Sequence, residues 1–289
     1  MQDAEQPLID AMKKVGAGDF EGATIRAADQ SGVLAHNFNQ MVEGLRERDK
    51  IRDTFGRYMT QQVSDAILKG EVKLGGERRH LTILRADLPE FESLAMTMGA
   101  EALVALLNRY FAAIVAAVME HDGVVDKFVG GDLLVIYGAP VKDPKHAEKA
   151  VRTALDMRAR MTAFNQAEKS ISGKTLHACV GIDTGPTVTG NIGCEARMEY
   201  TVIGRPVVVA ERLAQLAANS DADILLSEET AQEARGTFAL KPLPQPVDFG
   251  SGYVRRAYSV IGLGGRWRSL PDRVLGFFRL PPRYNRFRA

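Results

Sequence analysis

Residues 80–217 alternate short apolar runs of strand length with longer amphipathic segments, and this order limits the fold more than any other feature of the chain. Residues 80–87 predict a buried strand. Two β-rich runs, 123–129 and 133–137, flank Gly130-Gly131-Asp132 and predict a hairpin. Between the first strand and the hairpin, apolar residues at helical spacing predict one long helix: Leu103, Leu106, Leu107, Tyr110, Phe111, Ile114, Val115 and Val118.

The alternation continues beyond the hairpin. A second amphipathic helix is predicted at 147–164, a strand pair at 176–184 and 186–192, and a further helix at 208–217. The order β-α-β-β-α-β is typical of ferredoxin-like sheets whose helices cover one face. We therefore expect an α+β fold in which the other face of the sheet is left for a partner or a ligand.

The N-terminal part, residues 7–69, is helical in pattern and breaks at Gly16-Ala17-Gly18. After the break, four apolar residues are spaced four, three and four apart, as in a heptad seam: Leu34, Phe38, Met41 and Leu45. Two interpretations are open, a two-helix hairpin within one chain and a parallel coiled-coil dimer. We favour an N-terminal α-helical coiled-coil region, because the segment is long and thin.

The composition excludes several classes of protein. The 289 residues include 37 basic and 36 acidic side chains, so no overall basic field indicates a nucleic-acid partner. Cys179 and Cys194 are too few for a disulfide scaffold or a four-cysteine zinc site, and they fit a reducing compartment. Residues 1–10 lack the features of a signal peptide, and Asn108 and Arg109 interrupt the most apolar stretch. We expect a cytoplasmic location, including the cytosolic side of a membrane.

The last segment, residues 263–289, differs from the rest in composition. It carries seven arginines against one acid, Asp272, so its side-chain charge is +6, and aromatic residues are interleaved with the arginines. Such a mixture is compatible with contact with an anionic membrane surface. A disordered tail and a strap across the domain are equally open.

Two aspartates are placed where chemistry is common. Asp87 ends the first apolar strand, and Asp132 lies at the hairpin. If neighbouring strands carry them, their carboxylates meet at one end of the sheet, and carboxylate oxygens are the ligands that Mg²⁺ prefers. With Lys127 and Arg212 as fixed cations, the set fits phosphoryl or nucleotidyl transfer. On the residues alone, strand-end aspartates without function remain the commoner explanation.

Several short motifs make the chain resemble the class III adenylate and guanylate cyclases. They cover roughly residues 55–217 in register: GGERR at 75–79, LNRYF at 107–111, VDKFVG at 125–130, YGAP at 137–140, VGIDTG at 180–185, GNIG at 190–193 and RMEYTVIG at 197–204. The N-terminal part is similar to a HAMP signal-relay module through Gly18-Asp19-Phe20, Asp29 with Gly32, and Phe38-Asn39-Gln40-Met41. The resemblance implies a relay module at 1–52, a linker helix at 53–74, a cyclase domain at 75–262 and a tail at 263–289.

The resemblance also implies an activity and site residues. Active members convert ATP to cyclic AMP and pyrophosphate in a head-to-tail dimer, with two Mg²⁺ or Mn²⁺ ions held by two aspartates of one subunit. By position, Asp87 matches the first metal aspartate. Lys127 and Thr201 match the pair that reads adenine from the other subunit, and Arg212 matches the arginine that stabilises the transition state.

The chain departs from the family pattern at three positions. Gly131 stands where the second metal aspartate is expected, and the carboxylate, Asp132, comes one residue later. Val208 replaces the asparagine that orients the ribose, and Glu90 lies in the loop that should receive the triphosphate, after a proline that lacks an N–H.

These departures predict a degenerate adenylyl cyclase domain with an impaired two-ion site. Such a domain acts as a dimeric regulatory module, as a homodimer or as a heterodimer with an intact cyclase, and its binding of ATP is left open. The alternative is a genuine low-activity adenylyl cyclase that works as a head-to-tail homodimer with Asp132 as the shifted metal ligand. A ferredoxin-like fold reused for an unrelated purpose is the third interpretation.

Overall fold

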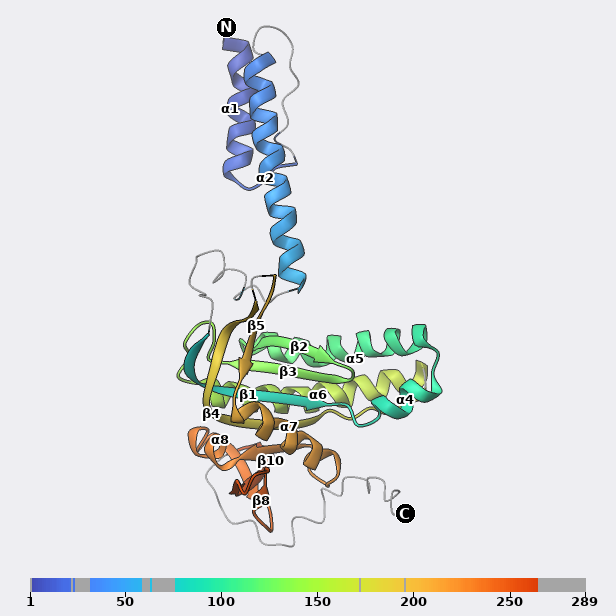
Figure 1. The fold of residues 1–289 in the computed structure, drawn as a ribbon. Helices are drawn as coiled ribbons and strands as arrows, with labels where there is room; N and C mark the ends of the chain where they lie inside the picture. The colour runs from blue at the N-terminus through green and yellow to red at the C-terminus, as the bar shows by residue number, and fades with distance from the viewer. Residues whose placement is uncertain are drawn as a thin grey trace. The chain divides into compact units, whose positions relative to one another are not determined.

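The computed structural model describes residues 2–21, 23, 32–58, 63, 76–171, 173–194 and 196–264. The chain separates into two compact units, Met1–Ser64 and Asp65–Ala289 (Figure 1). The basic aromatic segment at 265–289 lies outside the described residues, so its predicted membrane contact stays a prediction.

Among the described residues of the N-terminal unit, two long helices, α1 (Gln2–Gly16) and α2 (Gly32–Tyr58), lie side by side (Figure 1). They enclose a small apolar cluster in which Ala11 of α1 is buried with Phe38 and Val42 of α2. Arg46 of α2 donates hydrogen bonds to the backbone carbonyls of Phe20 and Glu21, which follow α1. The end of α1 therefore lies beside the middle of α2, and the two helices run in the same direction.

The predicted seam on α2 is only partly the contact with α1. Phe38 is buried, but Leu34 and Met41 are 57% and 50% exposed. The buried stripe within one chain is instead Ala35, Phe38 and Val42. Leu34 and Met41 form a second apolar stripe, and the coiled-coil dimer remains a prediction.

The second unit is built around one sheet with the strand order β2-β3-β1-β4-β6-β10-β7, to which β5 adds by pairing with β4. All neighbours are antiparallel except β4 and β6, which are parallel. The strands of this sheet are β1 (Glu77–Asp87), β2 (Val124–Val129), β3 (Asp132–Tyr137), β4 (Cys179–Cys194), β5 (Arg197–Ile203), β6 (Ile224–Ser227), β7 (Phe238–Pro242) and β10 (Ala257–Leu263). Two short strands, β8 (Val247–Asp248) and β9 (Val254–Arg255), pair separately.

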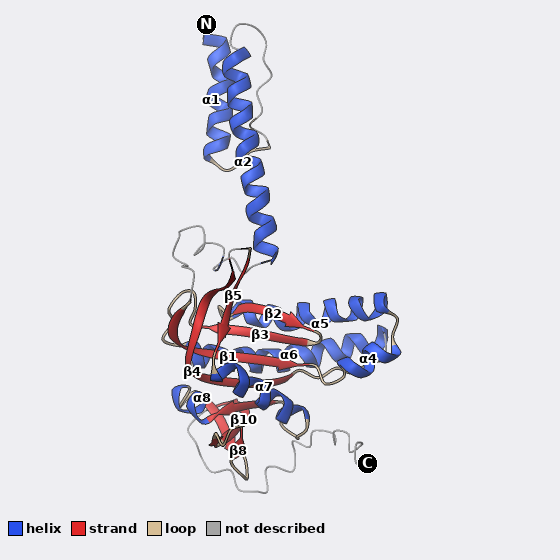
Figure 2. Ribbon diagram, viewed as in Figure 1, coloured by secondary structure: helices blue, strands red, loops and turns tan. Residues whose placement is uncertain are grey.

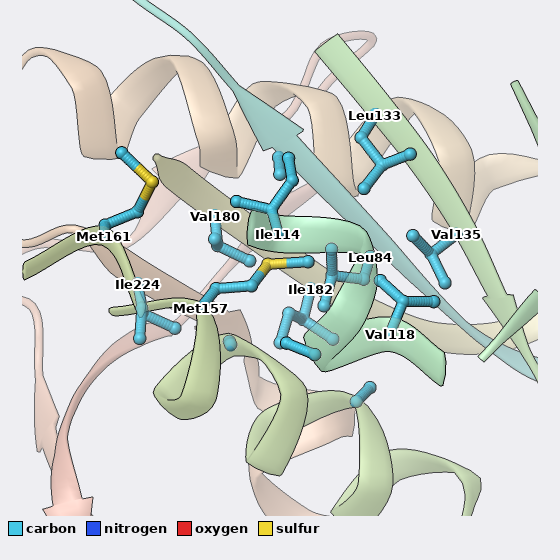
Figure 3. Close-up of a cluster of buried hydrophobic side chains, with 14 of the residues drawn as sticks. Leu84, Ile114, Val118, Leu133, Val135, Met157, Met161, Val180, Ile182 and Ile224 are labelled. Carbon is cyan, nitrogen blue, oxygen red and sulfur yellow. The ribbon is translucent and has the colours of Figure 1, made fainter. Parts of the chain in front are cut away.

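Helices lie on both faces of this sheet (Figure 2). The long helices α5 (Ala100–Glu120) and α6 (His146–Ile171) cover one face, and their apolar residues form the main core with Leu84 of β1 and Ile182 of β4 (Figure 3). The other face, which we expected to be left open, carries α7 (Arg205–Ala218) over β4 and β6, so that expectation is wrong for this part of the sheet. The short helices α4 (Phe91–Thr97) and α8 (Glu228–Glu233) follow β1 and β6.

Helix α7 approaches β4 closely because of one glycine. A Cβ at Gly181 would lie 2.0 Å from the carbonyl oxygen of Ala210 and 2.4 Å from the amide nitrogen of Ala214. Only glycine allows this contact without moving the helix. Because α7 lies so close to the sheet, its residues Glu211, Ala214 and Gln215 lie near Asp87 at the end of β1.

The predicted order β-α-β-β-α-β is confirmed as β1, α5, β2, β3, α6 and β4. One element is wrong, because the expected strand pair at 176–184 and 186–192 is the single long strand β4. Pro186 lies inside it opposite His80, beyond the residues that pair with β6 and before those that pair with β5. A proline is tolerated where no second neighbour needs its N–H.

Among the described helices, α5 has the length and composition of a membrane span, with a mean hydropathy of 1.9. Its buried residues, which include Leu106, Tyr110 and Ile114, belong to the main core of the sheet domain. A core helix satisfies the same criterion, so the hydropathy of α5 does not indicate a membrane.

Candidate functional site

Asp87 and Asp132 lie together at the end of the sheet. The register of β1 and β3 pairs Ala86 with Leu133, so the next residues, Asp87 and Asp132, face each other across the two strands. Their carboxyl groups are close enough to share a proton when one of them is protonated. Burial, then the hydrogen bond that this proton makes and the charge of Asp132, raises the pKa of Asp87 to about 7.

Arg85 lies beside this pair of carboxyl groups. Residues two apart in a strand share a face, so Arg85 lies on the same side of the sheet as Asp87. Its Nη2 atom donates to Oδ2 of Asp132 at 2.5 Å, with side-chain exposures of 13% for Arg85 and 26% for Asp132. The buried Nε of Arg85 has no hydrogen-bond partner among the described residues.

These groups line a cleft of about 440 Å³ between the strand ends, the loop after β1 and helix α7. The charged side chains in its lining are four carboxylates and one guanidinium, among the residues that the structure describes. They are Asp87, Glu92, Asp132, Glu211 and Arg85. The cleft is therefore acidic, and its arginine is already paired.

The hairpin turn explains why the second carboxylate is at position 132. Gly130 has φ +61°, which suits glycine in the tight turn. A Cβ at Gly131 would lie 2.8 Å from the Cβ of Phe91 and 3.0 Å from that of Leu88. Since those atoms are attached to the backbone, an aspartate at 131 would require the loop after β1 to move.

The loop after β1 differs from the expectation at Glu90. We expected its carboxylate to face an anionic ligand, and this is wrong, because both its oxygens are engaged by His177. The backbone N–H of His177 donates to Oε2 at 3.1 Å, and the ring Nδ1 lies against Oε1. The carboxylate that does line the cleft from this loop is that of Glu92.

Lys127 and Thr201 come together through Asp126, away from the lining of the cleft. Thr201 donates its hydroxyl hydrogen to Oδ2 of Asp126 at 3.1 Å, and the Nζ of Lys127 lies 3.7 Å from the same oxygen. Lys127 also donates to Glu199 at 3.3 Å. Asp126 is fully buried, and burial raises its pKa.

Helix α7 presents different residues on neighbouring faces. Glu211 and Gln215, one turn apart, line the cleft. Arg212 is exposed and Val208 is 51% exposed, and neither is in that lining. Within one chain, the structure thus brings Asp87 and Asp132 together but leaves Lys127, Thr201 and Arg212 apart from them.

Sequence reasoning expected the carboxylates of Glu90 and Glu92 in this region but missed four other charged residues: Arg85, Asp126, Glu199 and Glu211. Only Arg85 had a usable signal, because its position two residues before Asp87 in a strand places both on one face. The remaining residues are near the site through contacts between distant segments.

The donor set fits one divalent cation. Two carboxylates close enough to share a hydrogen bond suit Mg²⁺ or Mn²⁺, whose other positions are filled by waters and substrate phosphates. The described residues contain no group of three or more His, Cys, Asp or Glu side chains placed to bind a metal by themselves. The contact between Asp132 and Arg85 also means that one oxygen of the pair is already engaged by a cation.

Comparison with known proteins gives a consistent result. The family model of the adenylate and guanylate cyclase catalytic domain matches residues 76–244. Uncharacterized proteins of Mycobacterium tuberculosis and Mycobacterium bovis are 36% identical over 226 residues, which is 78% of this chain and 38% of theirs. The chain thus spans about two fifths of the length of these relatives.

Two solved structures are similar as well. The crystal structure of the guanylyl cyclase Cya2 is 30% identical with a TM-score of 0.61, covering 67% of this chain and 98% of that one. The crystal structure of the adenylyl cyclase CyaB from P. aeruginosa is 32% identical with the same TM-score and the same coverage.

Proposed function

The chain belongs to the adenylate and guanylate cyclase family, and we propose that it is a signal-transduction protein whose cyclase domain acts as a dimeric regulatory module with little or no turnover. The observation that carries this proposal is the charge of the cleft. Its lining contains four carboxylates, and its one arginine is bound to Asp132. A triphosphate is repelled by such a cleft unless several cations enter with it.

The reaction of the family sets what the residues would have to do. Asp87 and Asp132 would hold the divalent cation, which supplies a nucleophile from the ribose hydroxyl and charge neutralisation at the phosphate. Lys127 and Thr201 would bind the adenine of ATP, and Arg212 would stabilise charge on the phosphate oxygens. Val208 has no donor or acceptor to orient the ribose.

The expected deficit in rate is large. Removal of one preorganised group that stabilises the transition state typically costs about 10²–10³ in rate. The loss at position 208 comes together with an acidic cleft, and such effects do not simply add. Little cyclic AMP is therefore expected from this chain.

A dimer is part of the proposal, as a homodimer or as a heterodimer with an intact cyclase. Within one chain, Arg212 and Lys127 do not line the cleft that contains Asp87. Both therefore remain available to a cleft on a second subunit. A partner with an intact metal site would receive these residues but would still lack a ribose contact from Val208.

The N-terminal unit is proposed to transmit a signal to the cyclase domain as a HAMP-like relay at 1–52, through a linker at 53–74. Two parallel helices with an exposed apolar stripe at Leu34 and Met41 support this. The cyclase domain is placed at 75–262 and a tail at 263–289. We propose a cytoplasmic location, which includes the cytosolic side of a membrane.

A second function is favoured by one specific observation. Asp87 and Asp132 occupy facing positions on neighbouring strands, which supports a role for the shifted carboxylate beside Asp87. A genuine adenylyl cyclase of low activity, with Asp132 as the second metal ligand, is therefore the alternative.

One assay separates the two functions. The full chain is incubated with ATP and Mn²⁺, and cyclic AMP is measured against the Asp87→Asn variant and against a purified active adenylyl cyclase. We expect wild type and Asp87→Asn to give the same background. Turnover that Asp87→Asn abolishes would replace the regulatory module with the low-activity enzyme.

A further inference from the structure

We propose that Arg85 is a built-in cation that occupies the Asp132 side of the cleft and keeps the affinity for a divalent cation low. The inference rests on the proposed function, because it concerns the carboxylates assigned to the metal. It adds a residue, absent from the sequence-derived site, that determines how the site is loaded.

The first step is geometric. Arg85 extends from the middle of the sheet, with β3 on one side and β4 on the other. Its side chain is 13% exposed, so it is held in place far more firmly than an arginine at the surface. Its bond to Oδ2 of Asp132 occupies an oxygen that a metal ion would use.

The second step concerns charge. A guanidinium cannot lose its proton in a protein, so this competitor is permanent. A divalent cation that binds between Asp87 and Asp132 must displace Arg85 from Asp132. It is also repelled by the positive charge of the guanidinium, which stays nearby. Both effects weaken metal binding.

The third step concerns what removes the competitor. A guanidinium pairs with phosphate oxygens in a two-point contact that is at least as good as its contact with a carboxylate. A phosphate group in the cleft would attract Arg85 and release Asp132 to the metal. Arg85 thereby couples metal binding to phosphate binding, and the cleft takes up the two together rather than separately.

The test measures Mn²⁺ binding to the full chain without nucleotide, from the electron paramagnetic resonance signal of the free ion. Arg85→Gln removes the competing charge, and we expect it to bind Mn²⁺ about tenfold more tightly than wild type, the effect of one charge-assisted hydrogen bond. The double variant Arg85→Gln with Asp132→Asn should lose that gain. Arg160→Gln, a matched control on helix α6 that pairs with Glu120 and Asp156, should behave as wild type.

The outcomes are separable from those of the cyclase assay. Tighter Mn²⁺ binding by Arg85→Gln supports the inference whether or not the wild type makes cyclic AMP. Equal binding by wild type and Arg85→Gln overturns it, and so does the absence of Mn²⁺ binding in both.

A second variant guards against misfolding of Arg85→Gln, which circular dichroism would reveal. Arg85→Lys keeps the charge and loses the planar fork, so its Mn²⁺ affinity should lie between those of wild type and Arg85→Gln, within the tenfold range. Binding weaker than wild type would contradict a competing role.

Discussion

Two groups of charged residues in the cyclase domain each pair a cation with a carboxylate, but the two pairs differ in how exposed they are. We call them the metal end and the base-reading end, after the roles proposed for Asp132 and Lys127. At the metal end, Arg85 is 13% exposed and bonds to Asp132 at 2.5 Å. At the base-reading end, Lys127 is 38% exposed and bonds to Glu199, itself 52% exposed, at 3.3 Å. An exposed pair contributes little and exchanges readily, whereas a partly buried arginine pair is held.

The difference shows where the proposed regulatory role can be tested. Lys127 can leave Glu199 at small cost, because that pair is exposed. Arg85 is bound to Asp132 in a less exposed pair, so a cation at Asp132 has to compete with it. If both proposals hold, the domain binds the base of a nucleotide more readily than the metal ion.

The largest effect is expected from pH at the metal end. The pKa of Asp87 is about 7 in the folded chain and 3.8 by itself, so the folded state holds one more proton between these values. Asp87 therefore contributes a fall in the free energy of unfolding as pH rises from about 4 to about 7, of less than about 1.4 kcal/mol per pH unit, and no change above. Burial also raises the pKa of Asp183 to about 7, so a similar fall from that group remains when Asp87 is replaced. Urea unfolding in chelator at a series of pH values measures this.

Asp87→Asn should remove that part of the slope, and Asp221→Asn, at an exposed position, should keep it. An unchanged slope in Asp87→Asn would show that the two carboxyl groups do not share a proton. The metal end would then resemble the base-reading end.

A direct comparison of the two cations should give the next largest effect. Arg85→Gln leaves Asp132 without its charged partner, and we expect a loss of about 1.5–3 kcal/mol in the free energy of unfolding at pH 8. Lys127→Gln should change it by less than about 0.5 kcal/mol, because its pair is exposed. Equal losses in urea unfolding of the two variants would remove the contrast between the ends.

Packing under the hairpin should have a comparable or smaller effect. Gly131→Ala places a methyl group against Phe91 and Leu88, and we expect a loss of about 1–3 kcal/mol. Gly262→Ala is the matched control, since no atom lies within 4 Å of a Cβ built there. If thermal unfolding of Gly131→Ala matches that of Gly262→Ala, the loop after β1 is free to move and position 131 does not exclude an aspartate.

The sequence predicted the part of this fold that depends on local periodicity. The helices α5, α6 and α7 and the hairpin follow from the spacing of apolar residues, as does the order of the core elements. Strand β4 was divided in error because Gly185-Pro186 has the composition of a turn. Only the pairing of Pro186 with His80 of β1 shows that the strand continues through the proline.

The site was predictable only where a residue and its role lie in one short segment. Asp87 and Asp132 were found because each ends or begins a strand. The hydrogen bond from His177 to Glu90 joins residues 87 positions apart, and the ion pair of Arg85 with Asp132 joins residues 47 positions apart. Periodicity gives the face of a strand but not the side chain opposite it on the neighbouring strand.

The smallest effect is expected at the base-reading end, where it tests whether that end still recognises a base. Thr201 donates its hydroxyl hydrogen to Asp126, so its oxygen can only accept a further hydrogen bond. The exocyclic amine of adenine is a donor, whereas guanine has a carbonyl acceptor at the same position.

We expect Thr201→Val to weaken ATP binding about fivefold, or about 1 kcal/mol, and GTP binding hardly at all, by titration calorimetry with Mn²⁺. Thr162→Val, an exposed threonine of α6, is the control. If Thr201→Val weakens the binding of ATP and of GTP equally, Thr201 is only a structural partner of Asp126. The base-reading end would then not distinguish adenine from guanine through this residue.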